Sequence, residues 1–183
     1  NFHPTLSYAR RALRDHAKGP VFASTNGLYH LDPELSITVD LRRFEALAAE
    51  ARSAPAKAQR ARCFDEALAL YRGDFLEGNY ESWTEEIRNQ LSVRYDKLLG
   101  EAAHHYFEQG DYRRASELYG RLADRNPYHE EIHLKLMLCY HKLSDRRSIK
   151  EQYERLCRVL KDDLKVSPLP DTTKAFESLI SSL

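Results

Sequence analysis

Apolar residues recur at helical spacing through most of the chain, and in one region the pattern itself repeats with a period of about 34 residues, the length of a tetratricopeptide unit. Residues 96–129 correspond, position for position, to the stretch that begins at Glu130. The matched pairs are Ala102 and Leu136, Ala103 and Met137, Tyr106 and Tyr140, Tyr119 and Tyr153, and Leu122 and Leu156. A single helix pair of this kind cannot bury its own apolar face, so it must stack on its neighbours. The pattern predicts a mainly all-α fold made of tetratricopeptide-like helical repeats.

Helical spacing also predicts the elements on both sides of these repeats. Apolar stripes indicate helices over residues 39–52, 55–71, 81–109 and 147–161, with further helices between the breaks at Gly110, Pro127 and Ser144. The stripe within residues 81–109 runs without interruption from Trp83 to Tyr106. Two aromatic residues of the preceding loop, Phe75 and Tyr80, are expected to pack against the helices. A last amphipathic helix, carrying Phe176 to Leu183, would cap the repeats.

The N-terminal region has a different pattern. Residues 4–16 predict one helix, with Leu6, Ala9 and Leu13 on its apolar side. Two short apolar runs, 21–24 and 28–31, flank Asn26 and Gly27, a pair that favours a β-hairpin because both residues tolerate positive φ. A short helix followed by a hairpin is half of a winged helix. We therefore expect residues 1–32 to be the C-terminal part of a winged-helix DNA-binding domain, and residues 39–183 to form the tetratricopeptide-like domain.

Charge changes this picture only at the N-terminus. The chain has 28 Lys and Arg residues and 28 Asp and Glu residues, so its overall charge does not indicate nucleic acid or a membrane surface as a partner. Residues 1–31 are the exception, because they contain Arg10, Arg11, Arg14 and Lys18 against a single acid, Asp15. Any interaction with DNA is thus expected in this segment.

Cysteine content and hydropathy bound the location of the protein. Cys63, Cys139 and Cys157 lie within apolar helical patterns, which is typical of buried thiols in a reducing compartment, and we expect a cytoplasmic protein. No run of about 18 apolar residues predicts a membrane span. The chain begins at Asn1 without Met, within a helical pattern, so we expect a fragment of a longer protein.

The predicted N-terminal helix carries the candidate DNA-binding residues. Three arginines share this helix with small polar groups and one aromatic ring, the set being Thr5, Ser7, Tyr8, Arg10, Arg11 and Arg14. Arginines suit phosphates, whereas small polar side chains and a ring suit base edges in the major groove. The alternative is a solvated basic face on an ordinary terminal helix.

One motif matches a zinc hydrolase, but its context favours a structural role. His129, Glu130, Glu131, Ile132 and His133 fit the pattern HExxH. The repeat register places His133 toward the partner helix, as a core residue, and His129 in the first turn, as a capping residue. A third ligand is required, and none stands out downstream. Nucleophile elbows and phosphate-binding glycine loops are missing too, so we expect no enzyme, no metal and no cofactor.

The first helix of each repeat would line a concave groove. In this register the groove-facing residues are His104, Phe107, Leu134, Leu138 and His141. Such a mixture of aromatic, aliphatic and titratable groups could hold a peptide of a partner protein. Alternatively, the chain fills the groove itself, with the helix that carries Phe176 to Leu183.

Several phrases, taken together, carry a family resemblance. "SYARRAL" followed by "VFASTNGLYHLDP" resembles the recognition helix and wing of an OmpR-type winged helix. The remainder resembles the bacterial transcriptional activator domain of SARP-type, antibiotic-regulatory activators, through "VDLRRFEALAAEA", "ALALYRGDFLEGNYESW", "NPYHEEIHLKLM" and "QYERLCRVLKDDLKVSPLPDT". The "HEE" of HEEIH is an ordinary helix opening in that family.

The resemblance implies a cytoplasmic transcription factor that binds direct-repeat promoter DNA as a homodimer. Thr5, Ser7, Tyr8, Arg10 and Arg11 would face DNA. The helical domain would mediate self-association or contact RNA polymerase or another regulatory protein, and no membrane is involved. The second hypothesis is a tetratricopeptide-type adaptor that binds proteins and no DNA, and the third is a metal hydrolase.

Overall fold

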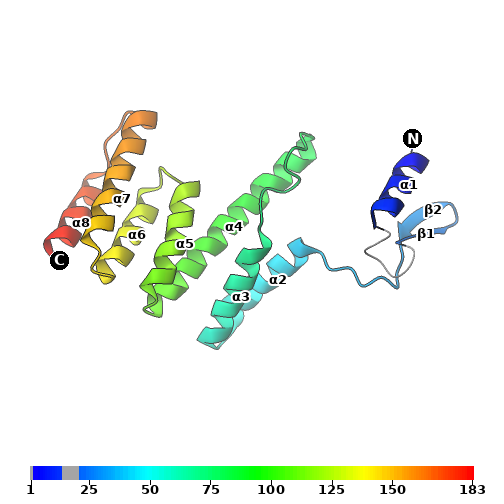
Figure 1. The fold of residues 1–183 in the computed structure, drawn as a ribbon, viewed down its shortest axis with the longest axis horizontal. Coiled ribbons are helices and arrows are strands. Elements are labelled where there is room, and N and C mark those ends of the chain that lie inside the picture. The colour runs from blue at the N-terminus through cyan, green and yellow to red at the C-terminus, as the bar shows by residue number, and fades with distance from the viewer. Residues whose placement is uncertain (1, 14–20) are drawn as a thin grey trace. The chain divides into compact units, whose positions relative to one another are not determined.

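The computed structural model describes residues 2–13 and 21–183, and the chain forms two compact units, Asn1–Val39 and Asp40–Leu183. Figure 1 shows the helices and strands of both units. We describe each unit by itself. Within the described residues, none of the helices has an apolar stretch of the length that a bilayer crossing requires.

The first unit consists of helix α1 (Phe2–Leu13) and the antiparallel strands β1 (Phe22–Thr25) and β2 (Leu28–Leu31). Phe22 pairs with Leu31 and Thr25 pairs with Leu28, which leaves a two-residue turn. Asn26 and Gly27 occupy this turn with φ values of 54° and 77°, as a type I′ turn requires. The predicted hairpin is confirmed, and the predicted helix begins two residues earlier than expected.

The second unit is a succession of antiparallel helices. Its elements are α2 (Asp40–Ser53), α3 (Lys57–Leu70), α4 (Ser82–Glu108), α5 (Tyr112–Arg125), α6 (Glu130–Lys142), α7 (Arg146–Val159), the π-helical turn η2 (Leu160–Leu164) and α8 (Pro170–Ser181). Each helix from α2 to α7 packs on the next one in the chain, and α8 packs on α6 and α7 (Figure 1). The predicted helical repeat fold is confirmed.

The repeat extends to the turns within the two helix pairs. Gly110 has a φ of 79° after α4, and Ser144, 34 residues later, has a φ of 57° after α6. The next residues, Asp111 and Asp145, each accept a hydrogen bond of 3.0 Å at the start of the following helix, from the backbone N–H of Arg114 and Ser148, respectively. Both are N-caps, which satisfy a backbone donor that the helix leaves unpaired. The same backbone path is thus built twice.

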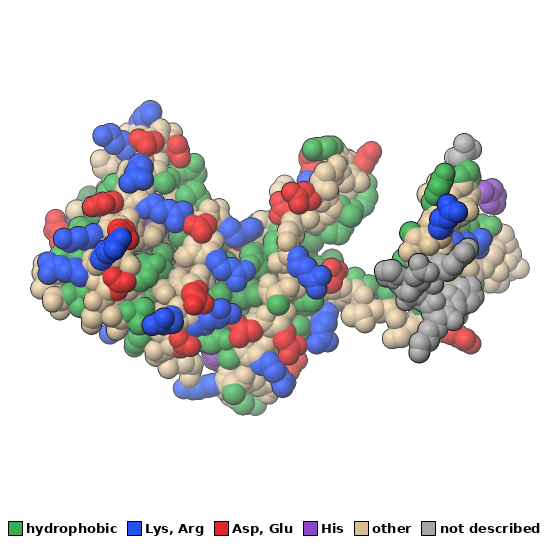
Figure 2. All heavy atoms as spheres, viewed as in Figure 1, with side chains coloured by type: hydrophobic (Ala, Val, Ile, Leu, Met, Phe, Trp, Pro, Cys, Tyr) green, Lys and Arg blue, Asp and Glu red, His purple; other side chains and the backbone are tan. Residues whose placement is uncertain are grey.

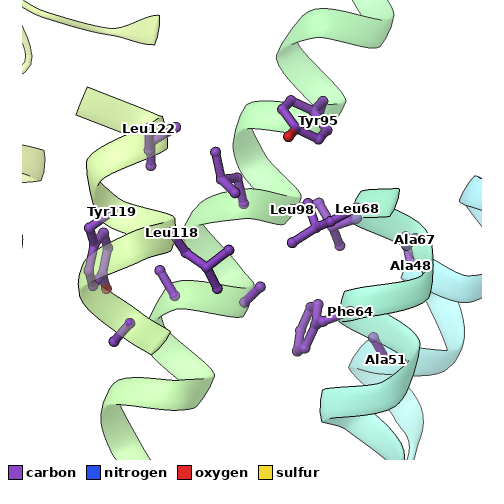
Figure 3. Close-up of a cluster of buried hydrophobic side chains, with 14 of the residues drawn as sticks. Ala48, Ala51, Phe64, Ala67, Leu68, Tyr95, Leu98, Leu118, Tyr119 and Leu122 are labelled. Atoms are coloured by element: carbon purple, nitrogen blue, oxygen red, sulfur yellow. The ribbon is translucent and has the colours of Figure 1, made fainter. Parts of the chain in front are cut away.

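The core forms where the helix pairs meet. Figure 3 shows side chains from α2, α3, α4 and α5 converging in one cluster, and Leu98 and Leu118 in it are fully buried. Alanine recurs among the most deeply buried positions, at Ala51, Ala67, Ala102, Ala103, Ala115 and Ala123. Small side chains let helix backbones approach while Leu, Phe and Tyr fill the remaining space, which is how interiors reach their high density.

The prediction from the apolar pattern is wrong at the beginning of α4. Trp83 is 52% exposed and Tyr80 is 86% exposed, although both were expected to pack. The residue that is buried there is Thr84, whose hydroxyl donates to the backbone carbonyl of Glu81 at 2.6 Å. The first turns of α4 lie beside the loop that precedes them (Figure 1). The apolar spacing of the sequence continues into these turns, although one side of the helix faces solvent there.

We expect Leu98→Ala to lower the free energy of unfolding by about 2–5 kcal/mol, because Leu98 is fully buried between helix pairs and its loss leaves a cavity. Urea denaturation followed by circular dichroism measures this change. The control is Val93→Ala on the same helix, an exposed position where the change should stay within about 0.5 kcal/mol. Equal effects of the two substitutions would contradict the assignment of the core.

Candidate functional site

Helix α1 presents most of the candidate DNA-binding residues to solvent. Thr5, Ser7, Tyr8, Arg10 and Arg11 are all exposed, Tyr8 to 71%, whereas Leu6 is buried. Arg14, the sixth candidate, lies outside the described residues. Helix α1 therefore presents two guanidinium groups, two hydroxyl groups and a phenol to solvent, with Arg10 one turn after the buried Leu6, and with Tyr8 and Arg11 on the opposite side of the helix.

A ring on the hairpin connects α1 to β2. The guanidinium of Arg10 lies 5.8 Å from the centre of the Tyr29 ring, and the His3 ring meets the same ring edge-on at 6.4 Å. A cation over an aromatic face contributes about 0.5–1 kcal/mol at an exposed site. Tyr29 thereby restrains Arg10 next to the hairpin. Tyr29 was not among the residues singled out in the sequence.

The five predicted groove residues lie in two different surroundings. His104 is exposed and faces an open pocket beside α2 and α3, whereas Phe107 is half-buried with its ring edge-on to Tyr112 at 5.2 Å. Leu134 and Leu138 are half-buried on α6. His141 lies against α8, where its Nε2 is 3.0 Å from the hydroxyl of Ser182. Helix α8 thus occupies the face of α6 to which a partner peptide was expected to bind.

The pocket beside His104 has a volume of about 340 Å³ and a mixed polar lining. Its walls come from α2, α3 and α4, and its lining residues are Ala51, Arg52, Arg60, Phe64, Glu101, His104, His105, Glu108 and Gln109. Arg52 Nε donates to Glu101 Oε2 at 2.8 Å, which closes an ion pair at this site. Burial lowers the pKa of His105, which packs against the Phe64 ring at 5.6 Å. The lining offers donors and acceptors in balance, with no strong charge of either sign.

The HExxH motif forms part of the core of the last repeat. His133 is fully buried, and its Nε2 donates to the backbone carbonyl of Pro127 at 3.0 Å. The other ring nitrogen, Nδ1, accepts a hydrogen bond from the side-chain amide of Gln152. Both nitrogens that could bind zinc are therefore engaged by the protein. Among the described residues, no three His, Cys, Asp or Glu side chains are grouped so that they could hold a metal.

His129 differs in detail from the expectation. It occupies the N-cap position of α6, as predicted, but its side chain makes no capping hydrogen bond. Its backbone carbonyl instead accepts from the N–H of Ile132 at 3.0 Å. The Glu130 carboxylate accepts a hydrogen bond from the backbone N–H of Leu169 at 2.9 Å. This bond attaches the segment before α8 to the start of α6.

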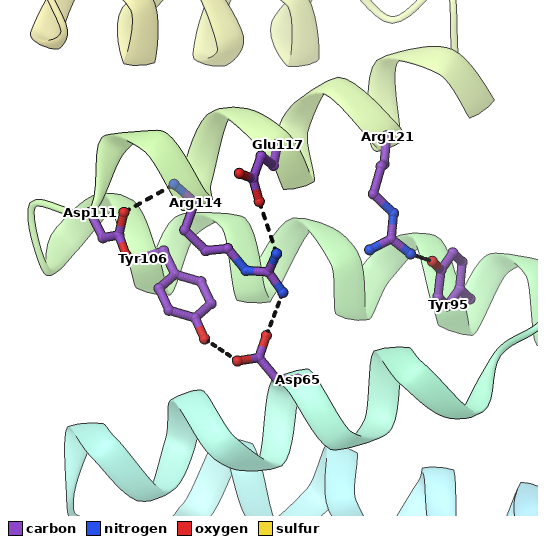
Figure 4. Close-up of polar contacts among 7 residues, drawn as sticks. All are labelled: Asp65, Tyr95, Tyr106, Asp111, Arg114, Glu117 and Arg121. Atoms are coloured by element: carbon purple, nitrogen blue, oxygen red, sulfur yellow. Dashed lines mark hydrogen bonds and ion pairs between the residues drawn. The ribbon is translucent and has the colours of Figure 1, made fainter.

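A polar cluster that the sequence did not reveal links three helices. Figure 4 shows Asp65 of α3 between Tyr106 of α4 and Arg114 of α5. The Tyr106 hydroxyl donates to Asp65 at 2.7 Å and Arg114 Nη2 donates to it at 2.8 Å, while Glu117 accepts from Arg114 Nη1 at 2.9 Å. Burial and the carboxylate of Asp65 raise the pKa of Tyr106 to about 12. The cluster is structural, because all of its groups bind one another.

The second close contact in Figure 4 joins Arg121 of α5 to the Tyr95 hydroxyl of α4. Tyr95 also stacks on Tyr71 with ring centres 4.1 Å apart, and Arg125 lies over both rings. These aromatic and cationic groups attach α5 to the beginning of the α3–α4 loop. They strengthen the junction between helix pairs.

His133 makes the stability of the protein dependent on pH. Burial lowers its pKa below the ordinary value of 6.5, so between the lowered pKa and 6.5 the unfolded chain binds a proton that the folded chain does not. Stability therefore falls as the pH falls through this window. We expect His133→Leu to reduce this slope, and at about pH 7.5 to cost about 1–3 kcal/mol because Pro127 and Gln152 lose a partner. Urea denaturation at several pH values measures both effects, with His104→Leu as the exposed control. An unchanged slope in His133→Leu would contradict the assignment.

Comparisons with known proteins agree with this fold. The profile of the family described as Bacterial transcriptional activator domain matches residues 39–180. Comparison with curated protein sequences gave no match. Among solved structures, the chain is similar to Mycobacterium tuberculosis EmbR in complex with a low affinity phosphopeptide, with a TM-score of 0.66 and 24% sequence identity. The similarity covers 99% of this chain and 49% of that chain, so the present chain spans about half the length of EmbR. Because the family profile matches most of the residues, the chain belongs to the bacterial transcriptional activator domain family.

Proposed function

We propose that the chain is part of a DNA-binding transcriptional regulator. In this proposal α1 and the hairpin contribute to promoter recognition, and the helical domain mediates self-association or contacts with the transcription machinery. The observation that carries it is the set of exposed polar side chains on a short helix next to a hairpin, namely Thr5, Ser7, Tyr8, Arg10 and Arg11. Arginine guanidinium groups suit phosphates, and the other three side chains suit base edges.

Residues 1–32 would be the C-terminal part of a winged helix, with the rest of that domain preceding Asn1 in a longer protein. Apolar side chains of this unit support the idea, because Leu28 is 74% exposed and Leu13 and Leu31 are also exposed. Two further helices of a complete winged helix would cover such positions. Residues 39–183 would be the activator domain. The whole protein would act in the cytoplasm as a homodimer on promoter DNA, with RNA polymerase or another regulator as a partner.

The alternative function is an adaptor that binds proteins and no DNA. The pocket beside His104 favours it, because a lining with balanced donors and acceptors and a Phe64 wall suits the backbone and one side chain of a peptide. His104 would then contact the ligand, whereas Phe107 is not part of the pocket lining. Leu134, Leu138 and His141 would contribute only if α8 moved away from α6.

DNA binding separates the two functions. The test uses the chain together with the segment proposed to precede Asn1, and a pool of random-sequence duplex DNA from which bound sequences are enriched. We expect Arg10→Glu combined with Arg11→Glu to weaken binding to the enriched sequence. The slope of log affinity against log salt should fall by about 0.9 for each phosphate contact that is lost.

The control reverses Arg113 and Arg158, two exposed arginines of the helical domain, in the same manner. This variant has the same net charge as the first, so it corrects for the overall field of the protein. Its affinity and salt slope should stay close to those of the unchanged protein. Failure to enrich any DNA at low salt, or equal losses in the two variants, would reject DNA binding through α1 and leave the adaptor function.

A further inference from the structure

The loop between α3 and α4 has a defined shape because the chain's own polar groups hold it. Arg88, in the second turn of α4, donates to the backbone carbonyls of Phe75, Leu76 and Asn79 at 2.9–3.0 Å. Thr84 donates to the carbonyl of Glu81 at 2.6 Å from a fully buried position. The loop therefore runs alongside the start of α4 (Figure 1) as a preformed surface, which loses little conformational freedom on binding.

Large apolar side chains are exposed on this preformed loop and on the first turn of α4. Tyr80 is 86% exposed, Trp83 is 52% exposed and Leu76 is 46% exposed. Phe75 supports Trp83 from beneath, with the two rings edge-on and their centres 6.5 Å apart. Tyr and Trp are the residues most enriched where protein partners bind strongly, since each buries a large apolar ring and keeps a polar edge.

The same segment carries an excess of negative charge. It has five exposed carboxylates, namely Asp74, Glu77, Glu81, Glu85 and Glu86. Within the part of the chain that the structure describes, none of them forms an ion pair. The sequence has no Lys or Arg from Gly73 to Ile87, so the two flanking cations, Arg72 and Arg88, balance only part of the five negative charges. Figure 2 shows acidic and hydrophobic side chains next to one another on this end of α4.

We propose that this acidic aromatic surface, formed by Leu76, Tyr80 and Trp83 with the five carboxylates around them, binds a basic amphipathic segment of a partner protein. Lys and Arg side chains of the partner would pair with the carboxylates and stack on the two rings, while its apolar side chains cover Leu76. The same carboxylates repel DNA, so the ligand proposed for this surface differs from the DNA proposed for α1. The inference rests on the proposed function of the helical domain as a protein-binding module.

Trp83 makes the surface directly observable, because it is the single tryptophan of the chain. The probe is a designed amphipathic peptide of Leu, Ala and Arg, compared with a peptide in which Glu replaces every Arg. We expect the basic peptide to shift the Trp83 emission to shorter wavelength as water leaves the ring. Its dissociation constant should rise about tenfold between low salt and physiological salt, because the exposed charges are then screened.

Two variants connect the binding to these residues. Glu77→Lys combined with Glu81→Lys should weaken binding of the basic peptide about tenfold or more, because each reversal places a cation opposite a cation. Tyr80→Ser should weaken binding through loss of the apolar ring. The matched control is Glu154→Lys combined with Glu177→Lys, two exposed carboxylates on α7 and α8, and it should change the affinity less than about twofold. Circular dichroism of each variant confirms that it is folded.

The surface is rejected if the acidic peptide binds as tightly as the basic one, or if neither changes the Trp83 emission. Equal losses in the test and control double variants would also reject it, as would an unchanged affinity of Tyr80→Ser. Failure of the DNA-binding function is distinguishable, because that function is measured with Arg10 and Arg11 variants on DNA. Peptide binding that persists in those variants supports the acidic aromatic surface whatever the result with DNA.

Discussion

The whole helical domain depends on the burial of one helix pair against the next. No pair could shield its own apolar face from water, so stability arises at the junctions, where buried alanines bring backbones together and Leu98, Leu118 and Leu136 fill the remaining space. Polar groups follow the same geometry. Asp65, Tyr106 and Arg114 bind one another because the apolar junction has already placed α3, α4 and α5 at hydrogen-bonding distance. Each helix pair is therefore stabilised mainly by the pairs next to it.

The sequence predicted those features whose causes are local or periodic. The helix pairs follow from apolar spacing, and Asn26 with Gly27 specifies the hairpin because few residues accept the backbone angles of its turn. The role of His133 was predictable too, since the repeat register places it inward. The structure adds that Pro127 and Gln152 occupy its two nitrogens.

Long-range features were not predictable from one sequence. Asp65 and Arg114 are 49 residues apart, and no periodic signal links an acid on one helix to a base two helices later. The exposure of Trp83 was missed for the opposite reason, because the periodic stripe continues into turns of α4 whose outer side meets solvent. His104 faces an open pocket and His141 contacts the end of α8, and this difference depends on where α8 packs. The amphipathic pattern of α8 shows that the helix has an apolar face, but it does not show which surface of the domain that face packs against.

The end helix also bears on how the protein behaves in solution. A stack of similar units has an apolar face at its last member, and two molecules could join there end to end and grow into fibres. Helix α8 covers that face in the same chain, with Phe176 stacked on Tyr153 at 4.0 Å and the segment before it bound to Glu130. The part of α6 and α7 that α8 covers is therefore unavailable to a further repeat or to a second molecule stacking in the same way.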